Sequence, residues 1–199
     1  ETTTLAAPDG PAEAWIARPD DADERADLPG VLFFVDAIGL RPQIAAMMER
    51  IAGWGYLVLA PHVFYRDGSA DELAPRVDLR APGGRESFMG GAMERVRALT
   101  PDRSEADALV WMQALQDLAP GPVGVTGYCM GARLAVRAAG QSSEVVVAVG
   151  GFHGGGLATD APDSPHRALA GAQAELVLLH ADQDRSMPPE QVAAFGEAI

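Results

Sequence analysis

Short apolar runs, bounded by glycine and proline, alternate along this chain with segments whose apolar residues recur at helical spacing. This alternation is typical of an α/β fold with a mostly parallel sheet and helices on both faces. Runs that are largely apolar indicate strands that are covered on both sides. The predicted buried strands span residues 31–35, 57–59, 123–127, 145–149 and 176–179, and residues 14–17 are predicted to form an early edge strand.

Helices are predicted between these strands from periodicity and from end signals. Ile44, Met47, Met48 and Ile51 recur at the spacing of one helix face, and glycines at positions 53 and 55 end that helix. A capping-box pattern over residues 104–107 predicts another helix start. Further helices are predicted over residues 132–139 and from residue 188 onward, with short helices in the irregular segment 63–103 and a solvated loop over the acidic residues 19–27.

The composition fits a single domain over residues 1–199 and excludes several classes of protein. The formal net charge of −13 repels nucleic acid, so we expect no nucleic-acid partner. One cysteine allows neither an internal disulfide nor a cysteine-rich zinc site, and we expect no metal or cofactor. No apolar run approaches the ~18 residues of a membrane helix and no signal peptide is found, so we expect a cytoplasmic protein without a membrane partner. The oligomeric state stays open.

The sharpest chemical signal is Gly127-Tyr128-Cys129-Met130-Gly131, which follows a predicted strand and precedes a predicted helix. It is the G-x-S-x-G nucleophile elbow with cysteine in the serine position. A nucleophile on such a strained turn needs neighbours without side chains two residues away on either side. The helix N-terminus then favours the thiolate, and the N–H of Met130 is placed to hold an oxyanion. The alternative is a small buried cysteine at a tight turn.

The Gly-Tyr-Cys-Met-Gly elbow resembles that of the dienelactone hydrolases, which are α/β-hydrolases with a Cys-His-Asp triad. Residues 35–39 are similar to the family's strand end, residues 61–66 to its Pro-x-x-aromatic-x-Arg region, and residues 184–189 to its acid loop. The resemblance spans nearly the whole chain. It implies an α/β-hydrolase fold and activity on small cyclic enol-lactones that carry a carboxylate.

Two departures from the family pattern stand out. Asp36 occupies the strand-end position where the family usually has glutamate. The family's histidine lies after a further strand that follows the acid-loop helix, whereas this sequence ends at Ile199 within that helix. We therefore expect the triad histidine, one strand and a terminal helix to lie beyond Ile199. None of the histidines present follows the acid loop; they are His62, His153, His166 and His180.

Two aspartates compete for the role of triad acid. Asp182 and Asp184 both follow the last predicted strand, and Asp184 is favoured because it has the family spacing to the proline pair; Asp182 is interpreted as a capping or solvated acid. By resemblance, Asp36 contacts the thiol and controls its protonation, and a loop hydrogen-bond acceptor is the alternative. The N–H of Ala37 or Ile38 is the expected second oxyanion donor.

Substrate-binding residues are predicted from their positions. Seven of the 15 arginines fall between positions 66 and 103, where a guanidinium could clamp a carboxylate, with ordinary surface pairing as the alternative. Arg80 and Arg85 are the chosen candidates because they lie mid-segment beside glycines and a proline. His153 follows a predicted strand within a glycine-rich run, and Tyr128 lies inside the elbow. Both are predicted to line the pocket, and His153 as a replacement base is the weaker alternative.

Together these features predict a hydrolase that cleaves a small ester or lactone. The Cys129 thiolate attacks the carbonyl and forms an acyl-enzyme, and water activated by a histidine, which Asp184 orients, releases the acid. Two alternatives stay open on the same fold. One is a non-catalytic, hydrolase-like binding protein that lacks a complete triad, and the other is an acyl-transfer or perhydrolysis enzyme.

Overall fold

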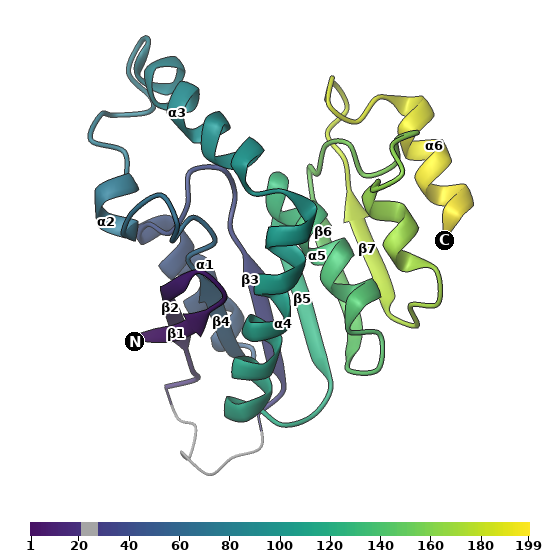
Figure 1. Cartoon of the computed structure of the whole chain (residues 1–199), viewed down its shortest axis with the longest axis horizontal. Coiled ribbons are helices and arrows are strands. Elements are labelled where there is room, and N and C mark those ends of the chain that lie inside the picture. The colour runs from purple at the N-terminus through teal and green to yellow at the C-terminus, as the bar shows by residue number, and fades with distance from the viewer. Residues whose placement is uncertain (21–27) are drawn as a thin grey trace.

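A seven-stranded sheet organises the computed structural model, which describes residues 1–20 and 28–199 (Figure 1). Most of the predicted acidic loop, residues 21–27, therefore lies outside the described residues. The strands are β1 Thr2–Ala7, β2 Gly10–Ala17, β3 Gly30–Phe34, β4 Leu57–Pro61, β5 Val123–Tyr128, β6 Val146–Phe152 and β7 Glu175–Leu179. Their spatial order is β1-β2-β4-β3-β5-β6-β7, and the strands from β4 to β7 in this order are parallel, as predicted.

An N-terminal hairpin joins this parallel sheet in the antiparallel sense. β2 is hydrogen-bonded to β1 on one side and to β4 on the other. The prediction that residues 14–17 form an edge strand is therefore wrong, because Thr2–Ala7 adds a further strand outside them. This outer strand is rich in threonine and has no fully buried residue, so it lacks the apolar pattern that marks a strand in the sequence.

Helices connect the strands in the expected order. They are α1 Pro42–Ala52, α2 Ala70–Leu73, α3 Gly84–Ala98, α4 Pro101–Leu118, α5 Met130–Gln141 and α6 Pro189–Ala198, with the 3-10 helix η1 at Pro165–Leu169. The irregular segment 63–103 contains one helix of 4 residues and one of 15 residues, so the expectation of short helices is met only in part. Within residues 1–20 and 28–199, no helix is both long and apolar enough to cross a membrane.

Helix α4 begins at Pro101 and not at the predicted start, Ser104. Proline suits the first helical position because the N–H that it lacks would have no partner there. Ser104 lies inside the helix, where its hydroxyl donates to the carbonyl of Pro101 at 3.0 Å. The pattern over residues 104–107 is thus a false start signal. A capping box is found instead at α2, where Ser69 and Glu72 bind each other's backbone N–H groups.

The two faces of the sheet are covered unequally (Figure 1). α4 and α5 pack over one face and share a core with its central strands, whereas α1 packs on β2 and β4. On the α1 side, no described helix covers β7, and Val177 and Leu179 are 58% and 56% exposed. The prediction that residues 145–149 and 176–179 are buried on both faces is therefore wrong, because an apolar run does not reveal whether a helix is available to cover it.

Candidate active site

The predicted elbow is a sharp turn at the carboxyl end of β5, where the strand passes directly into α5. Cys129 has φ 57° and ψ −119°, a backbone conformation that residues other than glycine rarely adopt. A Cβ at Gly127 would collide with the carbonyl of Gly131, and a Cβ at Gly131 would lie 2.5 Å from the carbonyl oxygen of Phe34. Only glycine fits at both positions, so the elbow spacing has a steric cause, and the end of β3 lies against the turn.

Two backbone N–H groups near Cys129 have no acceptor among the described residues. Met130 is the first residue of α5, so its N–H has no partner within the helix. At the end of β3, the N–H of Ile38 donates to Oδ1 of Asp36 at 2.9 Å, whereas the N–H of Ala37 donates to no described group. Of the two N–H groups predicted as the second oxyanion donor, that of Ala37 is the one left available.

Asp36 is held by an ion pair next to the elbow. Arg41 Nη1 and Nη2 lie 2.7 Å from Asp36 Oδ1 and Oδ2, respectively. The two side chains are about one-fifth exposed, so the bidentate pair is shielded from most of the solvent. No hydrogen bond joins Asp36 to Cys129 in the described part of the chain. Control of the thiol by Asp36 stays a prediction.

Asp184 lies in the acid loop, which we define as residues 181–188, between β7 and α6. Its Oδ1 accepts hydrogen bonds from the hydroxyl of Ser186 at 2.6 Å and from the N–H of Ser186 at 2.8 Å. These bonds, helped by the nearby imidazoles of His153 and His180, lower the pKa of Asp184. Asp182 is exposed and makes no side-chain hydrogen bond to the described residues. The ordered carboxylate of Asp184 supports the choice between the two acids.

The glycine-rich run after β6 connects the elbow helix to the acid loop. A Cβ at Gly154 would lie 2.7 Å from Cβ of Ala132 in the first turn of α5, and a Cβ at Gly155 would collide with Ser186. The N–H of Gly156 donates to the carbonyl of Ser186 at 2.8 Å. The glycines thus allow protein segments to approach one another closely.

The four histidines occupy different environments. His153 is exposed, has a left-handed φ of 42°, and its N–H donates to the carbonyl of Leu179 at 2.8 Å. His62 is buried, which lowers its pKa, and one ring nitrogen lies 2.9 Å from the carbonyl of Gly68. His166 Nδ1 lies 2.8 Å from the hydroxyl of Ser164. His153 and His180 are the two that act electrostatically on Asp184, so His153 stays a candidate for lining the site.

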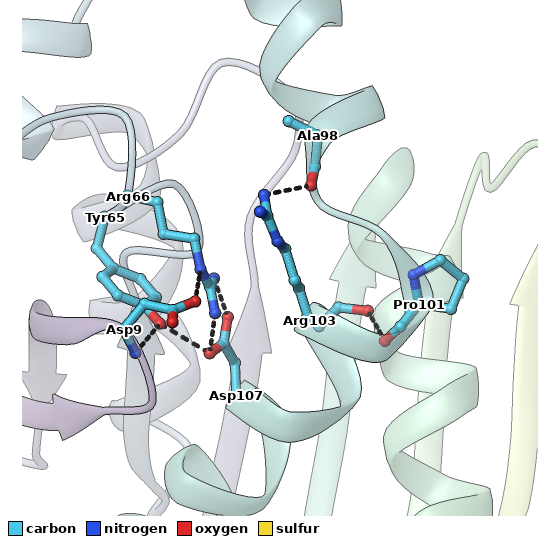
Figure 2. A network of polar contacts seen from close by, with 8 residues as sticks. Asp9, Tyr65, Arg66, Ala98, Pro101, Arg103 and Asp107 are labelled. Atoms are coloured by element: carbon cyan, nitrogen blue, oxygen red, sulfur yellow. Dashed lines mark hydrogen bonds and ion pairs between the residues drawn. The ribbon is translucent and has the colours of Figure 1, made fainter.

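Arg66, which belongs to the segment similar to the family's Pro-x-x-aromatic-x-Arg region, is fully engaged by other protein groups (Figure 2). Its guanidinium binds both oxygens of the buried Asp107 at 2.6 and 2.9 Å and one oxygen of Asp9 at 2.5 Å. The hydroxyl of Tyr65 also donates to Asp107, at 3.0 Å. These acids raise the pKa of Arg66. The network joins the β1–β2 turn, the loop after β4 and α4, and it leaves Arg66 without a free hydrogen-bonding edge for a carboxylate.

A cavity of about 350 Å³ opens beside Met130, between the α3–α4 junction, α5 and the loop 156–165. Arg80 and Arg85 are exposed and are not among its lining residues. The arginines that do line it are Arg97, Arg133 and Arg137. Of these, only Arg97 belongs to the seven arginines between positions 66 and 103 in which the sequence predicted a carboxylate clamp. The sequence does contain a pattern that points to Arg133 as a residue near the site, because it follows Cys129 by four residues, about one helical turn.

Tyr128 lies in an aromatic stack. Its ring is 5.5 Å from that of Phe33 and 4.7 Å from that of Phe152, measured between centroids. Burial raises the pKa of its hydroxyl. Its side chain lines a different cavity, on the side of the sheet that carries α1, and not the cavity beside Met130. That Tyr128 contacts the substrate therefore stays a prediction, whereas its ring packs directly against Phe33 and Phe152.

Sequence comparisons match the chain to a family model and to curated relatives. A family model described as "Dienelactone hydrolase family" matches residues 12–199. A protein of Escherichia coli (strain K12), named "Putative carboxymethylenebutenolidase", is 26% identical over 191 residues, which are 94% of this chain and 65% of that protein. A Synechocystis protein of the same name is 25% identical over 181 residues, which are 86% of this chain and 68% of that protein. The chain thus spans about two thirds of the length of these relatives.

A structural comparison agrees with the sequence match. The solved structure named "m3DLH" superposes with a TM-score of 0.76 and 20% identity, covering 100% of this chain and 75% of that one. The mostly parallel sheet and the strand-to-helix elbow are those of the α/β-hydrolase fold. Because the family model covers nearly the whole chain, this protein belongs to the dienelactone hydrolase family.

Proposed function

We propose that the protein hydrolyses a small ester or lactone through Cys129. The observation that carries the proposal is the strained backbone of Cys129 at the start of α5, with the N–H groups of Met130 and Ala37 left without acceptors among the described residues. A helix N-terminus favours a thiolate over a thiol. Two unengaged N–H groups near the sulfur suit an oxygen that gains negative charge. Membership of a hydrolase family supports the same chemistry.

The proposed reaction has two steps. The sulfur of Cys129 attacks the carbonyl carbon, and the carbonyl oxygen gains a negative charge that Met130 and Ala37 stabilise. The bond to the leaving oxygen breaks, that oxygen takes up a proton, and a thioester remains on Cys129. Water then attacks the thioester, the carboxylic acid leaves, and the thiolate is regenerated. A histidine that we propose lies beyond Ile199 transfers the protons, and Asp184 orients it.

Intact-mass analysis tests this proposal. Brief incubation with 4-nitrophenyl acetate, followed by acid quenching, should add one acetyl group, and peptide mapping should place it on Cys129. Turnover without any adduct on Cys129, or an adduct on another residue that forms and decays at the turnover rate, contradicts the proposal. Binding of esters with neither adduct nor turnover would favour the non-catalytic alternative. Added alcohol or hydrogen peroxide, followed by product analysis, separates hydrolysis from acyl transfer and perhydrolysis.

A further inference from the structure

The cavity beside Met130 has a charge opposite to that of the whole chain. It is lined by the α3–α4 junction, by the first turns of α5 and by the loop 156–165. Its charged lining residues are three arginines and one acid, in a chain whose net charge is −13. They are Arg97, Arg133, Arg137 and Asp163. The mechanism described above uses none of them.

The arginines of the cavity differ in how they are paired. Arg137 Nη1 donates to Glu105 at 2.8 Å, and its Nη2 donates to the main-chain carbonyl of Asp163. Arg97 is exposed to solvent. Arg133 makes no hydrogen bond and no ion pair with any residue in the described part of the chain, although it is partly buried. Arg97 likewise has no partner among the described residues, but water solvates it. Arg133 is therefore the partly buried cation of this cavity whose hydrogen-bonding capacity is left for a ligand.

Desolvation makes Arg133 a favourable partner for an anion. Burial lowers its pKa, because the charged guanidinium loses contact with water, while the nearby Cys129 opposes this effect. The side chain still carries its charge at neutral pH, since the ordinary pKa of an arginine lies far above neutrality. A half-buried cation without a counter-ion raises the free energy of the folded protein, because folding removes part of its water. An anion that binds in the cavity offsets this cost.

The position of Arg133 relates the cavity to the nucleophile. Cys129 is the N-cap residue of α5, and Arg133 follows it by four residues, about 6 Å along the helix axis. Cys129 is close enough to act electrostatically on Arg133. Met130 lines the cavity and also supplies the proposed oxyanion N–H. A ligand that fills the cavity therefore reaches the elbow from the side of α4 and α5.

We propose that Arg133 binds a carboxylate on the substrate while the substrate's ester or lactone carbonyl faces Cys129. This rests on the proposed function and assigns recognition of the anion to a residue other than Arg66, Arg80 or Arg85. The planar guanidinium offers two parallel N–H donors, which match the two oxygens of a carboxylate. The hydroxyl-bearing residues Thr100 and Thr159 also line the cavity and add polar surface around such a group.

Alkylation of Cys129 tests Arg133 without requiring turnover. Cys129 is the chain's only cysteine, so reaction with iodoacetate, which is anionic, or with iodoacetamide, which is neutral, reports on this site alone. The ratio of the two rates cancels any change in the fraction of thiolate. Arg133→Gln should lower the iodoacetate-to-iodoacetamide ratio about tenfold. Arg103→Gln removes an exposed arginine outside the cavity and should change the ratio less than about twofold.

Equal ratios in the wild type and in Arg133→Gln, with both proteins folded by circular dichroism, would overturn the proposal. Arg133→Lys, which keeps the charge but loses the planar fork, should retain an intermediate ratio and serves as the second variant if the glutamine variant does not fold. If Arg133→Lys had the same iodoacetate-to-iodoacetamide ratio as wild type, the proposal of a bidentate contact would also be overturned.

Ester hydrolysis by the same variants separates this inference from the proposed function. 4-Nitrophenyl acetate is neutral, whereas the 4-nitrophenyl hemiester of succinic acid carries a carboxylate. Arg133→Gln should raise KM for the hemiester about tenfold and leave KM for the acetate nearly unchanged. Equal losses on both esters, with an unchanged alkylation ratio, overturn the role of Arg133 and leave hydrolysis by Cys129 standing. No turnover of either ester by the wild type, with the expected shift in alkylation ratio, overturns the hydrolase and supports the anion site.

Discussion

The elbow and the acid loop both follow strands of the sheet, yet different interactions hold them in place. At the elbow, main-chain segments lie in contact, and Gly127 and Gly131 leave no room for a side chain. In the acid loop, Asp184 is held by the side chain and the N–H of Ser186, whose own carbonyl accepts a hydrogen bond from the N–H of Gly156. The main chain thus determines the geometry around Cys129, whereas that of Asp184 depends in part on one replaceable side chain.

This difference matches the demands of the proposed chemistry. A nucleophile must be held at a defined place relative to its oxyanion donors, and main-chain contacts between β3, β5 and α5 achieve this without side-chain entropy. A triad acid has to orient one imidazole, which a hydrogen-bonded loop can do. We therefore expect substitutions at the elbow to have large effects, and those around Asp184 to range from large to small according to how directly they touch the carboxylate.

The largest effect is expected at the nucleophile itself. Cys129→Ala should abolish ester hydrolysis and all thiol labelling, because no other residue can form the thioester. The fold should persist, which circular dichroism and thermal unfolding would check. Cys129→Ser should be far slower than wild type, since a serine needs a stronger base than a thiol. Hydrolysis at the wild-type rate in the alanine variant would disprove the assignment.

Asp184→Asn should come next, with turnover reduced by two to four orders of magnitude, because an amide cannot stabilise the imidazolium form of the triad histidine as a carboxylate does (a comparable loss is about 10⁴ in a serine protease). Asp182→Asn is the matched control, and its turnover should stay close to wild type. Steady-state kinetics on one activated ester, with the full-length protein, would measure both. The reverse ranking would identify Asp182 as the triad acid.

Gly131→Ala should destabilise the fold by about 2 kcal/mol or more, because the added Cβ would press against the main chain at the end of β3. Gly196→Ala, in α6, is the matched control: its Cβ would meet no atom within 4 Å, so the change should be neutral or stabilising by up to about 1 kcal/mol. Denaturant unfolding measures both. Equal stabilities for the two variants would show that the elbow tolerates a side chain at position 131, and would contradict the conclusion that close main-chain contacts fix its geometry.

The smallest effect is expected from Ser186→Ala. The hydrogen bonds from Ser186 lower the pKa of Asp184 in the folded protein, so the ionised carboxylate favours folding above its unfolded pKa, and this contribution is lost as the pH falls through the folded pKa. In Ser186→Ala the pKa of Asp184 should be higher than in wild type. The contribution of this carboxylate to folding stability should therefore be lost at a higher pH. NMR titration of the Asp184 carboxyl carbon measures the shift. Ser87→Ala, far from this loop, should leave the titration unchanged; an unchanged titration in Ser186→Ala would mean that the backbone N–H alone holds the carboxylate.

The parts of the fold that sequence reasoning predicted correctly depend on neighbours in the chain. The alternation of strands and helices follows from periodicity, and the elbow follows from a five-residue spacing whose steric cause lies largely in a single turn. The choice of Asp184 over Asp182 rests on a spacing of the same short range, and it stays a prediction. The strand Thr2–Ala7 escaped prediction because its stability comes from pairing with β2 and not from its own apolar pattern.

By itself, the sequence determined where the elbow with its cysteine and most of the strands lie, because these follow from short-range sterics and from the spacing of apolar residues. Only the tertiary structure decided which charges are paired. Arg66 is engaged by Asp107, 41 residues away, while Arg133 has no partner among the residues that the structure describes. Such pairing depends on which distant segments the fold brings within about 3 Å, a distance that no local pattern encodes. The charge of the cavity beside Met130 is therefore a property of the folded chain.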